Sequence, residues 1–317
     1  MINLGKRKSK KKNNKIWLEF AIAIIILIAG AYYGKDYIPE EYLNKVQDEI
    51  NQIGIKNDEQ KTTEVDGNLR VYFIDVGQAD SILVTNQKET MLIDAGNNED
   101  GELVSSYIKS LGISKINYLV GTHPHEDHIG GLDNVIKNFE IGTVYLPEST
   151  TNTKTYEDVL DAIADKNLQI TVPKIGDTFK VGLAENEVIW VSNEKNLNNS
   201  SIVIKTVYGS QSFLFTGDAE AEVEAKMKLS EATVLKVGHH GSSSSTSQIL
   251  LNKVKPKYAI ISCGKNNDYG HPTNKILDRL NQYGCEIHRT DLEGTILITT
   301  NGENIEINSF ETKTNGN

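Results

Sequence analysis

The chain has 317 residues, of which 38% are apolar and 24% are charged. These values are typical of a globular protein and exclude wholesale disorder. The net charge is −10, but seven basic side chains precede residue 16, which leaves 26 of the 33 Lys and Arg against all 43 Asp and Glu. The rest of the chain is so acidic that it excludes binding of nucleic acid through an extended basic surface. Any nucleic-acid function therefore depends on a local site or a bound metal.

The first 68 residues carry signals for export. Residues 1–15 form a basic tail, and residues 16–33 are the only long apolar run, which is about 27 Å long as a helix and marginally spans a bilayer core. The basic tail predicts a cytoplasmic N-terminus. The small residues at 29–31 also suit cleavage of a signal peptide. We expect a signal-anchor in the cell membrane with an extracytoplasmic domain, or a secreted protein, with residues 34–68 as a stalk.

A β-rich pattern extends from residue 69 to residue 310, before a polar tail over 311–317. In chain order, the first half predicts strands over 70–75, 81–85, 90–94, 118–121 and 143–145, and helices over 101–111, 129–139 and 156–166. The second half predicts strands over 169–171, 188–191, 201–207, 212–215, 233–237, 258–262, 286–289 and 294–299, and helices over 220–229, 248–254 and 274–283. Each half is a β-meander that continues into βα units, which predicts two sheets sandwiched by helices.

The strongest chemical signal follows the strand predicted to end at residue 121. There the sequence reads THPHEDHIGG over residues 122–131. In an extended segment His123 and His125 point the same way and can chelate one ion. Asp127 and His128 then fall on the first turn of the next helix and can face a second ion. The glycine pair at 130–131 lets the backbone pass close to the site.

Six of the seven histidines lie in three clusters, at 123–128, 239–240 and 271, and Asp218 follows a predicted strand between the first two. The order His-x-His-x-Asp-His, then Asp, then His resembles the metallo-β-lactamase fold superfamily. The blocks FIDVGQADS (73–81), LIDAG (92–96), VGHHGS (237–242) and YGHP (269–272) look like the extracytoplasmic hydrolase domain of ComEC-type competence proteins. A bacterial phosphorylcholine esterase is similar in the same blocks. The resemblance implies an α/β fold, the αββα metallo-β-lactamase sandwich, preceded here by one N-terminal membrane helix.

The same resemblance implies a site for two divalent metal ions. His123 and His125 would bind the first ion, Asp218 would bridge the two, and Asp127, His128 and one histidine of the pair at 239 and 240 would bind the second. We prefer His240 as the ligand, with His239 facing the substrate. Many family members add another His before the bridging Asp, but this chain has none from residue 129 to 238. The loop with Asn199, which we expect behind the ligands or at the substrate edge, occupies that interval. Fewer nitrogen ligands admit manganese beside zinc.

Four further candidates each have a structural alternative. Asp94 would hold a ligand imidazole from behind, or cap its own turn. Asp75, Gln78 and Asp80 would line the substrate edge of the site, or serve the turn between two strands.

The expected reaction is metal-dependent hydrolysis of a phosphodiester, with DNA as one candidate, by a nuclease-like enzyme outside the membrane. The expected catalytic groups are Asp127, which also binds metal, and His239 or His271, which would contact or protonate the leaving oxygen. For His271 an ordinary loop histidine is the alternative. A single membrane helix provides no DNA channel. A cell-wall esterase acting on phosphorylcholine and a metal-stabilised binding module without turnover are the other functions that we consider.

The two cysteines, Cys263 and Cys285, are predicted to stay free thiols. Cys263 ends one predicted strand, and Cys285 begins the next after a helical crossover. In parallel neighbours these positions lie at opposite strand ends, about 15 Å apart over five residues. A disulfide needs Cα atoms within about 7 Å, so the predicted placement excludes one.

Overall fold

The computed structural model describes residues 67–310 of the chain. The predicted basic tail, the apolar run over 16–33, the stalk up to residue 66 and the polar tail from 311 lie outside the described residues. Within the described part, no helix is both long and apolar enough to cross a membrane. The anchor and the stalk therefore stay predictions.

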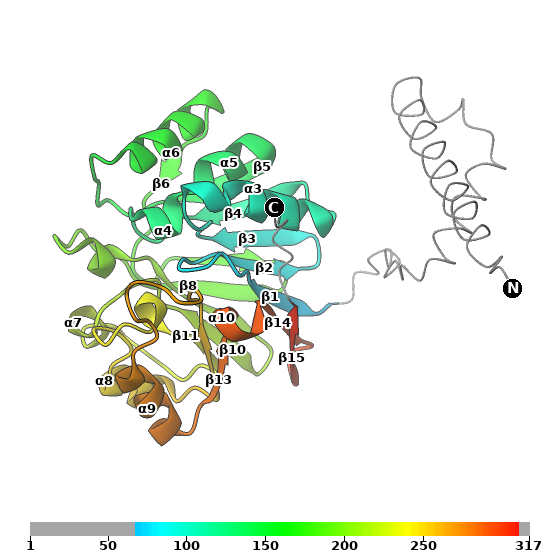
Figure 1. Cartoon of the computed structure of the whole chain (residues 1–317). Coiled ribbons are helices and arrows are strands. Elements are labelled where there is room, and N and C mark those ends of the chain that lie inside the picture. Colours follow the sequence, from blue (N-terminus) through cyan, green and yellow to red (C-terminus); the bar gives the residue numbers. More distant parts are fainter. Residues whose placement is uncertain (1–66, 311–317) are drawn as a thin grey trace, which may run out of the picture. The chain divides into compact units, whose positions relative to one another are not determined.

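Eight strands form the first sheet (Figure 1). In spatial order they are β15 (Ile305–Phe310), β14 (Thr295–Thr300), β1 (Leu69–Phe73), β2 (Ile82–Asn86), β3 (Glu89–Ile93), β4 (Lys115–Val120), β5 (Glu140–Tyr145) and β6 (Ile170–Thr171). Pairing is antiparallel from β15 to β3 and parallel from β3 to β6. Because β3 and β4 are parallel, their carboxyl ends lie side by side at one edge of the sheet.

Seven strands form the second sheet. In spatial order they are β13 (Glu286–Arg289), β12 (Tyr258–Ile261), β11 (Val234–Lys236), β10 (Gln211–Phe215), β9 (Val203–Tyr208), β8 (Ala184–Trp190) and β7 (Thr178–Val181). The four strands from β13 to β10 are parallel, and the rest are antiparallel. The carboxyl ends of β10, β11 and β12 therefore also meet at one edge.

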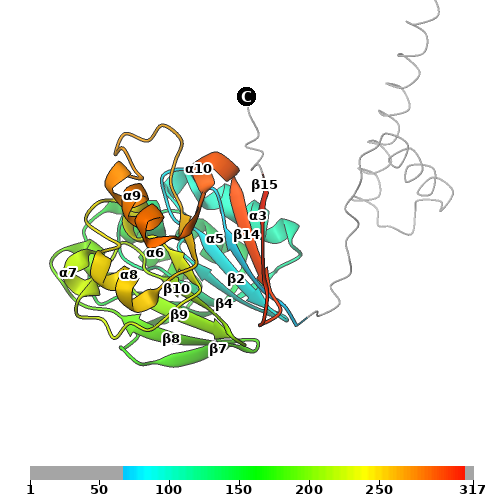
Figure 2. The same cartoon turned by 90° about the horizontal axis from the view of Figure 1, so that it is seen from below.

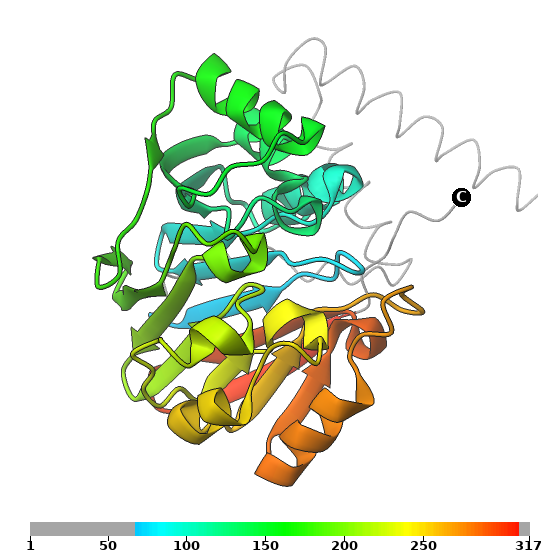
Figure 3. The same ribbon diagram turned by 90° about the vertical axis from the view of Figure 1, so that its left-hand side faces the viewer.

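Helices cover the outer faces of both sheets, so the domain has four layers in the order αββα (Figure 2 and Figure 3). The first sheet packs against α3 (Gly101–Ser110), α5 (Leu132–Asn138) and α6 (Lys154–Asp165), and the second against α7 (Ala221–Glu224), α8 (Gln248–Val254) and α9 (Asn274–Tyr283). The short α4 (Glu126–Ile129) precedes α5, and α10 (Thr290–Glu293) precedes β14. Between the sheets lies an apolar core that includes Phe73, Phe213 and Phe215. The predicted two-sheet sandwich is confirmed.

The helix predicted over 129–139 is interrupted, so that α4 ends at Ile129 and α5 begins at Leu132. A Cβ on Gly130 would lie 2.3 Å from the backbone of Asn97, and one on Gly131 would lie 2.3 Å from the carbonyl oxygen of Ala95. The chain therefore passes too close to the loop after β3 for a side chain. The glycine pair allows a close approach, as predicted, but to the loop after β3 and not to the ligands themselves.

The other differences from the predicted elements fall mostly on edge strands. The strand predicted over 169–171 was assigned to the second meander, but β6 pairs parallel with β5 in the first sheet. Strands β7 and β15 were not predicted, and both lie at sheet edges. An edge strand buries few side chains, so its hydrophobic pattern is weak. The helix predicted over 220–229 is shorter, because α7 ends at Glu224.

Both cysteines are free and buried, as predicted. β12 and β13 are parallel neighbours, with Tyr258 opposite Glu286 and Ile261 opposite Arg289. Cys263 follows the carboxyl end of β12 and Cys285 precedes the amino end of β13. The two thiols thus lie near opposite ends of the strand pair.

Candidate metal centre

Loops that follow parallel strands bring the predicted ligands to one edge of the sandwich. β4 runs into the segment that carries His123 and His125, β10 into the turn with Asp218, and β11 into the turn with His240. His125 stands directly before α4, whose first turn carries Asp127. β10 and β11 are parallel neighbours in the second sheet, and the packing of the first sheet against it brings the loop after β4 to the same edge.

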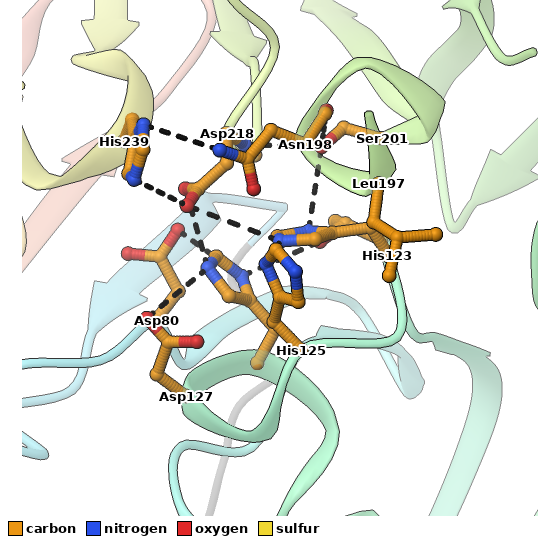
Figure 4. Close-up of polar contacts among 12 residues, drawn as sticks. Asp80, His123, His125, Asp127, Leu197, Asn198, Ser201, Asp218 and His239 are labelled. Atoms are coloured by element: carbon orange, nitrogen blue, oxygen red, sulfur yellow. Dashed lines mark hydrogen bonds and ion pairs between the residues drawn. The ribbon is translucent and has the colours of Figure 1, made fainter. Parts of the chain in front are cut away.

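His123 and His125 turn their imidazoles toward each other, as the extended segment predicts. Nε2 of His123 lies 3.0 Å from Nδ1 of His125 and 3.9 Å from Oδ2 of Asp218. Figure 4 shows the Asp218 carboxylate facing His123 on one side and His239 on the other. His123 is fully buried, whereas His125 is partly exposed. His123 thus lies between His125 and the carboxylate of Asp218.

A second group consists of Asp127, His128, Asp218 and His240, with one ligand atom of each within 4.8 Å of the others. Oδ1 of Asp218 lies 3.2 Å from Nε2 of His128 and 3.8 Å from Nε2 of His240. Oδ2 of Asp127 lies 3.2 Å from Nε2 of His240. Asp218 thus turns one oxygen to each group, as a bridging carboxylate does. Of the histidine pair, it is His240 that joins this group.

Hydrogen bonds from behind determine which nitrogen each imidazole presents to the centre. Nδ1 of His128 lies 2.8 Å from Oδ2 of Asp94, and Nδ1 of His240 lies 3.0 Å from the carbonyl oxygen of Ser262. Both oxygens accept, so each Nδ1 carries hydrogen and each Nε2 is left for a ligand. Buried Asp94 also accepts from the N–H and the hydroxyl of Thr122, at 2.8 and 2.7 Å. Asp94 therefore stands behind His128 rather than capping its own turn.

The electrostatics of the centre favour a bound cation. Burial opposes a charge on His128, but the carboxylates of Asp218 and Asp94 outweigh it and hold the His128 pKa well above its ordinary value. Burial likewise opposes the charge on Asp218, but His128 and His240 outweigh it and hold the Asp218 pKa well below its ordinary value. Burial dominates at His123, whose pKa is well below its ordinary value. A divalent cation can replace the protons that the carboxylates otherwise hold on the imidazoles.

The donor set fits divalent metal ions. Nε2 of His128, Nε2 of His240 and Oδ1 of Asp218 are buried atoms that make no hydrogen bond within the described residues. Buried polar atoms are costly unless they have a partner. Imidazole nitrogens with carboxylate oxygens are the usual ligands of zinc and also suit manganese. The orphaned atoms therefore mark a candidate metal site.

Comparison with known protein families identifies the superfamily to which this domain belongs. The model of the Metallo-beta-lactamase superfamily matches residues 74–265, more than half of the chain. The chain belongs to the metallo-beta-lactamase superfamily. The resemblance seen in the sequence motifs is thereby confirmed.

Three curated relatives bear the names of competence or recombination proteins. The chain is 33% identical to ComE operon protein 3 of Bacillus subtilis over 71% of this chain and 32% of that protein. It is 30% identical to Recombination protein 2 of Haemophilus influenzae over 76% of this chain and 30% of that protein. It is also 30% identical to Competence protein ComA of Neisseria gonorrhoeae, over 70% and 31%. The chain thus spans less than a third of the length of these relatives and resembles a ComEC-type hydrolase domain.

The centre of this metallo-beta-lactamase domain opens into a cleft of about 340 Å³. Gln78, His239 and His271 line the cleft together with Asp127 and Asp218. The rings of His239 and His271 lie edge to face, with centroids 5.7 Å apart. The pKa of His271 is lowered, mainly by burial of its ring and to a smaller extent by the neighbouring His239. Burial therefore favours the neutral form of the His271 imidazole at the wall of the cleft.

Asp75 and Asn199 do not line the cleft. Asp75 serves the turn between two strands, which was the alternative to a place at the substrate edge. Its Oδ1 accepts the N–H of Gly77 at 3.2 Å. Asn199 is buried, and its Oδ1 accepts a backbone N–H of the loop before α7 at 3.1 Å. Its neighbour Asn198 lines the cleft instead, with Nδ2 3.5 Å from Nδ1 of His239. Asn199 therefore lies behind the cleft, and Asn198 is the residue of this loop that the sequence did not single out.

Asp80 lies behind the centre rather than at the substrate edge, because Lys236 holds it there. Lys236 ends β11, its side chain is fully buried, and its ammonium forms an ion pair with Oδ2 of Asp80. Oδ1 of Asp80 lies 3.5 Å from Nδ1 of His240, and Oδ2 lies 3.8 Å from Nδ1 of His128. Lys236 was not predicted as a site residue. The only feature of the sequence that could have indicated a role for Lys236 is its position in a short run of otherwise apolar residues.

Proposed function

We propose that this domain is a dinuclear metal-dependent phosphodiesterase. The proposal is carried by the position of Asp218, which turns Oδ2 toward His123 and Oδ1 toward His128 and His240. A carboxylate between two ligand groups is the arrangement with which two-metal hydrolases hold their ions. When bound, the cations would supply Lewis acidity to the phosphoryl group and lower the pKa of an attacking water.

The two ligand groups differ, and the difference bears on the metal. Asp127, His128 and His240 supply two imidazoles and a carboxylate to one side, in addition to Asp218. On the other side His123 faces the shared carboxylate and contacts His125, so water would have to supply further ligands to an ion held there. More oxygen among the ligands suits manganese better than it suits zinc. We therefore propose that Mn²⁺ is at least as effective as Zn²⁺.

On the cleft side, His239 and His271 hold the leaving oxygen. Nε2 of His239 lies 3.6 Å from Oδ2 of Asp218, so this imidazole stands next to the bridge. Asn198 and Ser244 approach its Nδ1 at 3.5 and 3.3 Å and fix the ring from behind. We propose that His239, which stands next to the bridging carboxylate, protonates the leaving oxygen, with His271 beside it in the cleft.

The substrate that we propose is DNA, bound over only one or two phosphates. The names of the three relatives support a nucleic-acid substrate, whereas the acidic body argues against an extended groove. Both observations hold if the metal ions supply the positive field at the cleft. We also propose that the domain acts outside the membrane, because a basic tail precedes the apolar run at 16–33. Protease added to intact cells should then digest the domain.

The full chain, purified in detergent and freed of metal, tests the activity. With Mn²⁺ or Zn²⁺ it should hydrolyse bis-p-nitrophenyl phosphate and, more slowly, single-stranded DNA. Asp218→Asn should abolish turnover and reduce bound metal while leaving the fold intact. Asp158→Asn is the matched control, because Asp158 pairs with Lys154 on the exposed face of α6, and it should have no effect.

Two results would replace the proposal. Cleavage of p-nitrophenylphosphorylcholine with no cleavage of DNA under any divalent ion would favour the cell-wall esterase. Binding of metal without hydrolysis of any phosphodiester would favour a binding module.

A further inference from the structure

Tyr269 is a large aromatic side chain left open to solvent at the cleft of the metal centre. It keeps 74% of its surface exposed, and it lines the same cleft as Asp218 and His239. Exposed aromatic rings are costly to hydrate. A ring that stays exposed beside a candidate catalytic centre is therefore a candidate for contact with a ligand.

The loop that carries Tyr269 is held in place by its own hydrogen bonds. The Asn267 side chain donates to the carbonyl oxygen of Gly264 at 2.9 Å and to that of His271, and it accepts the N–H of His271 at 3.0 Å. The N–H of Thr273 donates to the carbonyl oxygen of Gly241 at 3.0 Å. This last bond ties the loop to the turn with His240, so the ring has a defined place relative to the centre.

The ring is stacked on one side only. Tyr269 lies over the imidazole of His271, with centroids 5.9 Å apart and planes 25° from parallel. His271 meets His239 edge to face at 5.7 Å, and His239 stands 3.6 Å from the bridging carboxylate of Asp218. The three rings lead from the mouth of the cleft to the centre, and Tyr269 ends the series.

We propose that Tyr269 stacks against a nucleobase of a single-stranded substrate, beside the phosphate that is cleaved. The proposal rests on the phosphodiesterase function proposed above and adds a residue that selects the substrate. An acidic domain has few basic side chains to bind phosphates, and base stacking supplies affinity that needs none. Every base has a π-face, so such binding tolerates any sequence. Paired bases are already stacked, so the ring favours unpaired nucleotides.

A quaternary ammonium such as choline is the other ligand that an open aromatic ring can attract. Choline is recognised by cages of several aromatic rings. Among the described residues that line the cleft, Tyr269 is the only aromatic ring apart from imidazoles. One open face suits a planar base better than a compact cation, which favours the nucleobase.

Two single-stranded oligonucleotides of equal length, one with bases and one abasic, test the proposal on the Mn²⁺-loaded full chain. For the wild type, kcat/KM should be higher for the base-bearing strand. In Tyr269→Ala the ratio of the two kcat/KM values should fall about tenfold. Tyr269→Phe keeps the ring and should keep the ratio. Leu292→Ala is the surface control, because Leu292 is 70% exposed and does not line the cleft.

The outcomes separate this proposal from the function on which it rests. If the wild type cleaves both strands and Tyr269→Ala leaves the ratio unchanged, the stacking role is wrong and the phosphodiesterase stands. If the wild type cleaves neither strand, the proposed function itself fails. If Tyr269→Ala weakens only the cleavage of p-nitrophenylphosphorylcholine, the ring serves a cation and the nucleobase is excluded.

Discussion

Replacement of Lys236 by methionine tests the buried ion pair behind the metal centre. The side chains of Lys236 and Asp80 are 0% and 2% exposed. Methionine resembles the stem of lysine in shape, so the change removes a charge and little packing. It leaves the carboxylate of Asp80 buried beside His128 and His240 without its cation.

The expected loss of stability is large. Removing one partner of a buried ion pair costs about 3–5 kcal/mol. A domain of this size loses about 2–4 °C of melting temperature per kcal/mol. Lys236→Met should therefore lower the melting temperature of the metal-free protein by about 6–20 °C. The double variant Asp80→Asn/Lys236→Met removes the unpaired charge as well and should recover part of the loss.

Thermal unfolding of the metal-free full chain, followed by near-UV circular dichroism, measures these shifts. Lys115→Met is the matched control, because Lys115 contacts Glu140 at 2.7 Å but the two side chains are 47% and 69% exposed. An exposed pair is worth at most about 1 kcal/mol. A loss in Lys236→Met no larger than that in Lys115→Met would refute the reasoning. So would a double variant that is less stable than Lys236→Met alone.

Three further predictions concern the outer contacts, the protons and the thiols. Asp94→Asn keeps the shape but removes the charge that holds His128 from behind, so metal affinity measured by competition with a chelator should weaken about 10–100-fold; an unchanged affinity would mean that Asp94 only supports the backbone. Because the pKa of His128 is raised in the folded state, its contribution to the stability of the metal-free protein is complete below about pH 6.5 and is lost as the pH rises through the folded value. Unfolding in chelator should therefore show stability falling on the alkaline side, and a rise there would contradict the assignment. Quantitative alkylation of the denatured, unreduced chain should label both Cys263 and Cys285, whereas no labelling would indicate a disulfide.

The sequence predicts the position of most candidate ligands because each follows a strand whose pattern is clear. The runs that became β4, β10 and β11 are short, apolar and buried, and parallel strands must end at a common edge. Asp218 and His240 could therefore be expected together, whereas His123 joins them through the packing of the two sheets. Strands β7 and β15 could not, since an edge strand buries too few side chains to leave a periodic pattern.

The residues that were missed depend on the direction of single side chains. Asn198 and Asn199 are adjacent in one short turn, and only the folded chain shows that Asn198 faces the cleft. Lys236 lies on a buried strand, and its role depends on Asp80, which comes from the other half of the domain. Such a pairing arises from the packing of two sheets and leaves no periodicity in either segment.

We propose that two metal ions, held by one bridging carboxylate, perform phosphodiester hydrolysis in this domain. The most direct test is the rate of hydrolysis of bis-p-nitrophenyl phosphate as Mn²⁺ is added stepwise to the metal-free full chain. The rate should be negligible without metal, rise with added Mn²⁺ and level off at two equivalents per chain. Full activity in chelator, saturation at one equivalent or no hydrolysis at any ratio would contradict the claim.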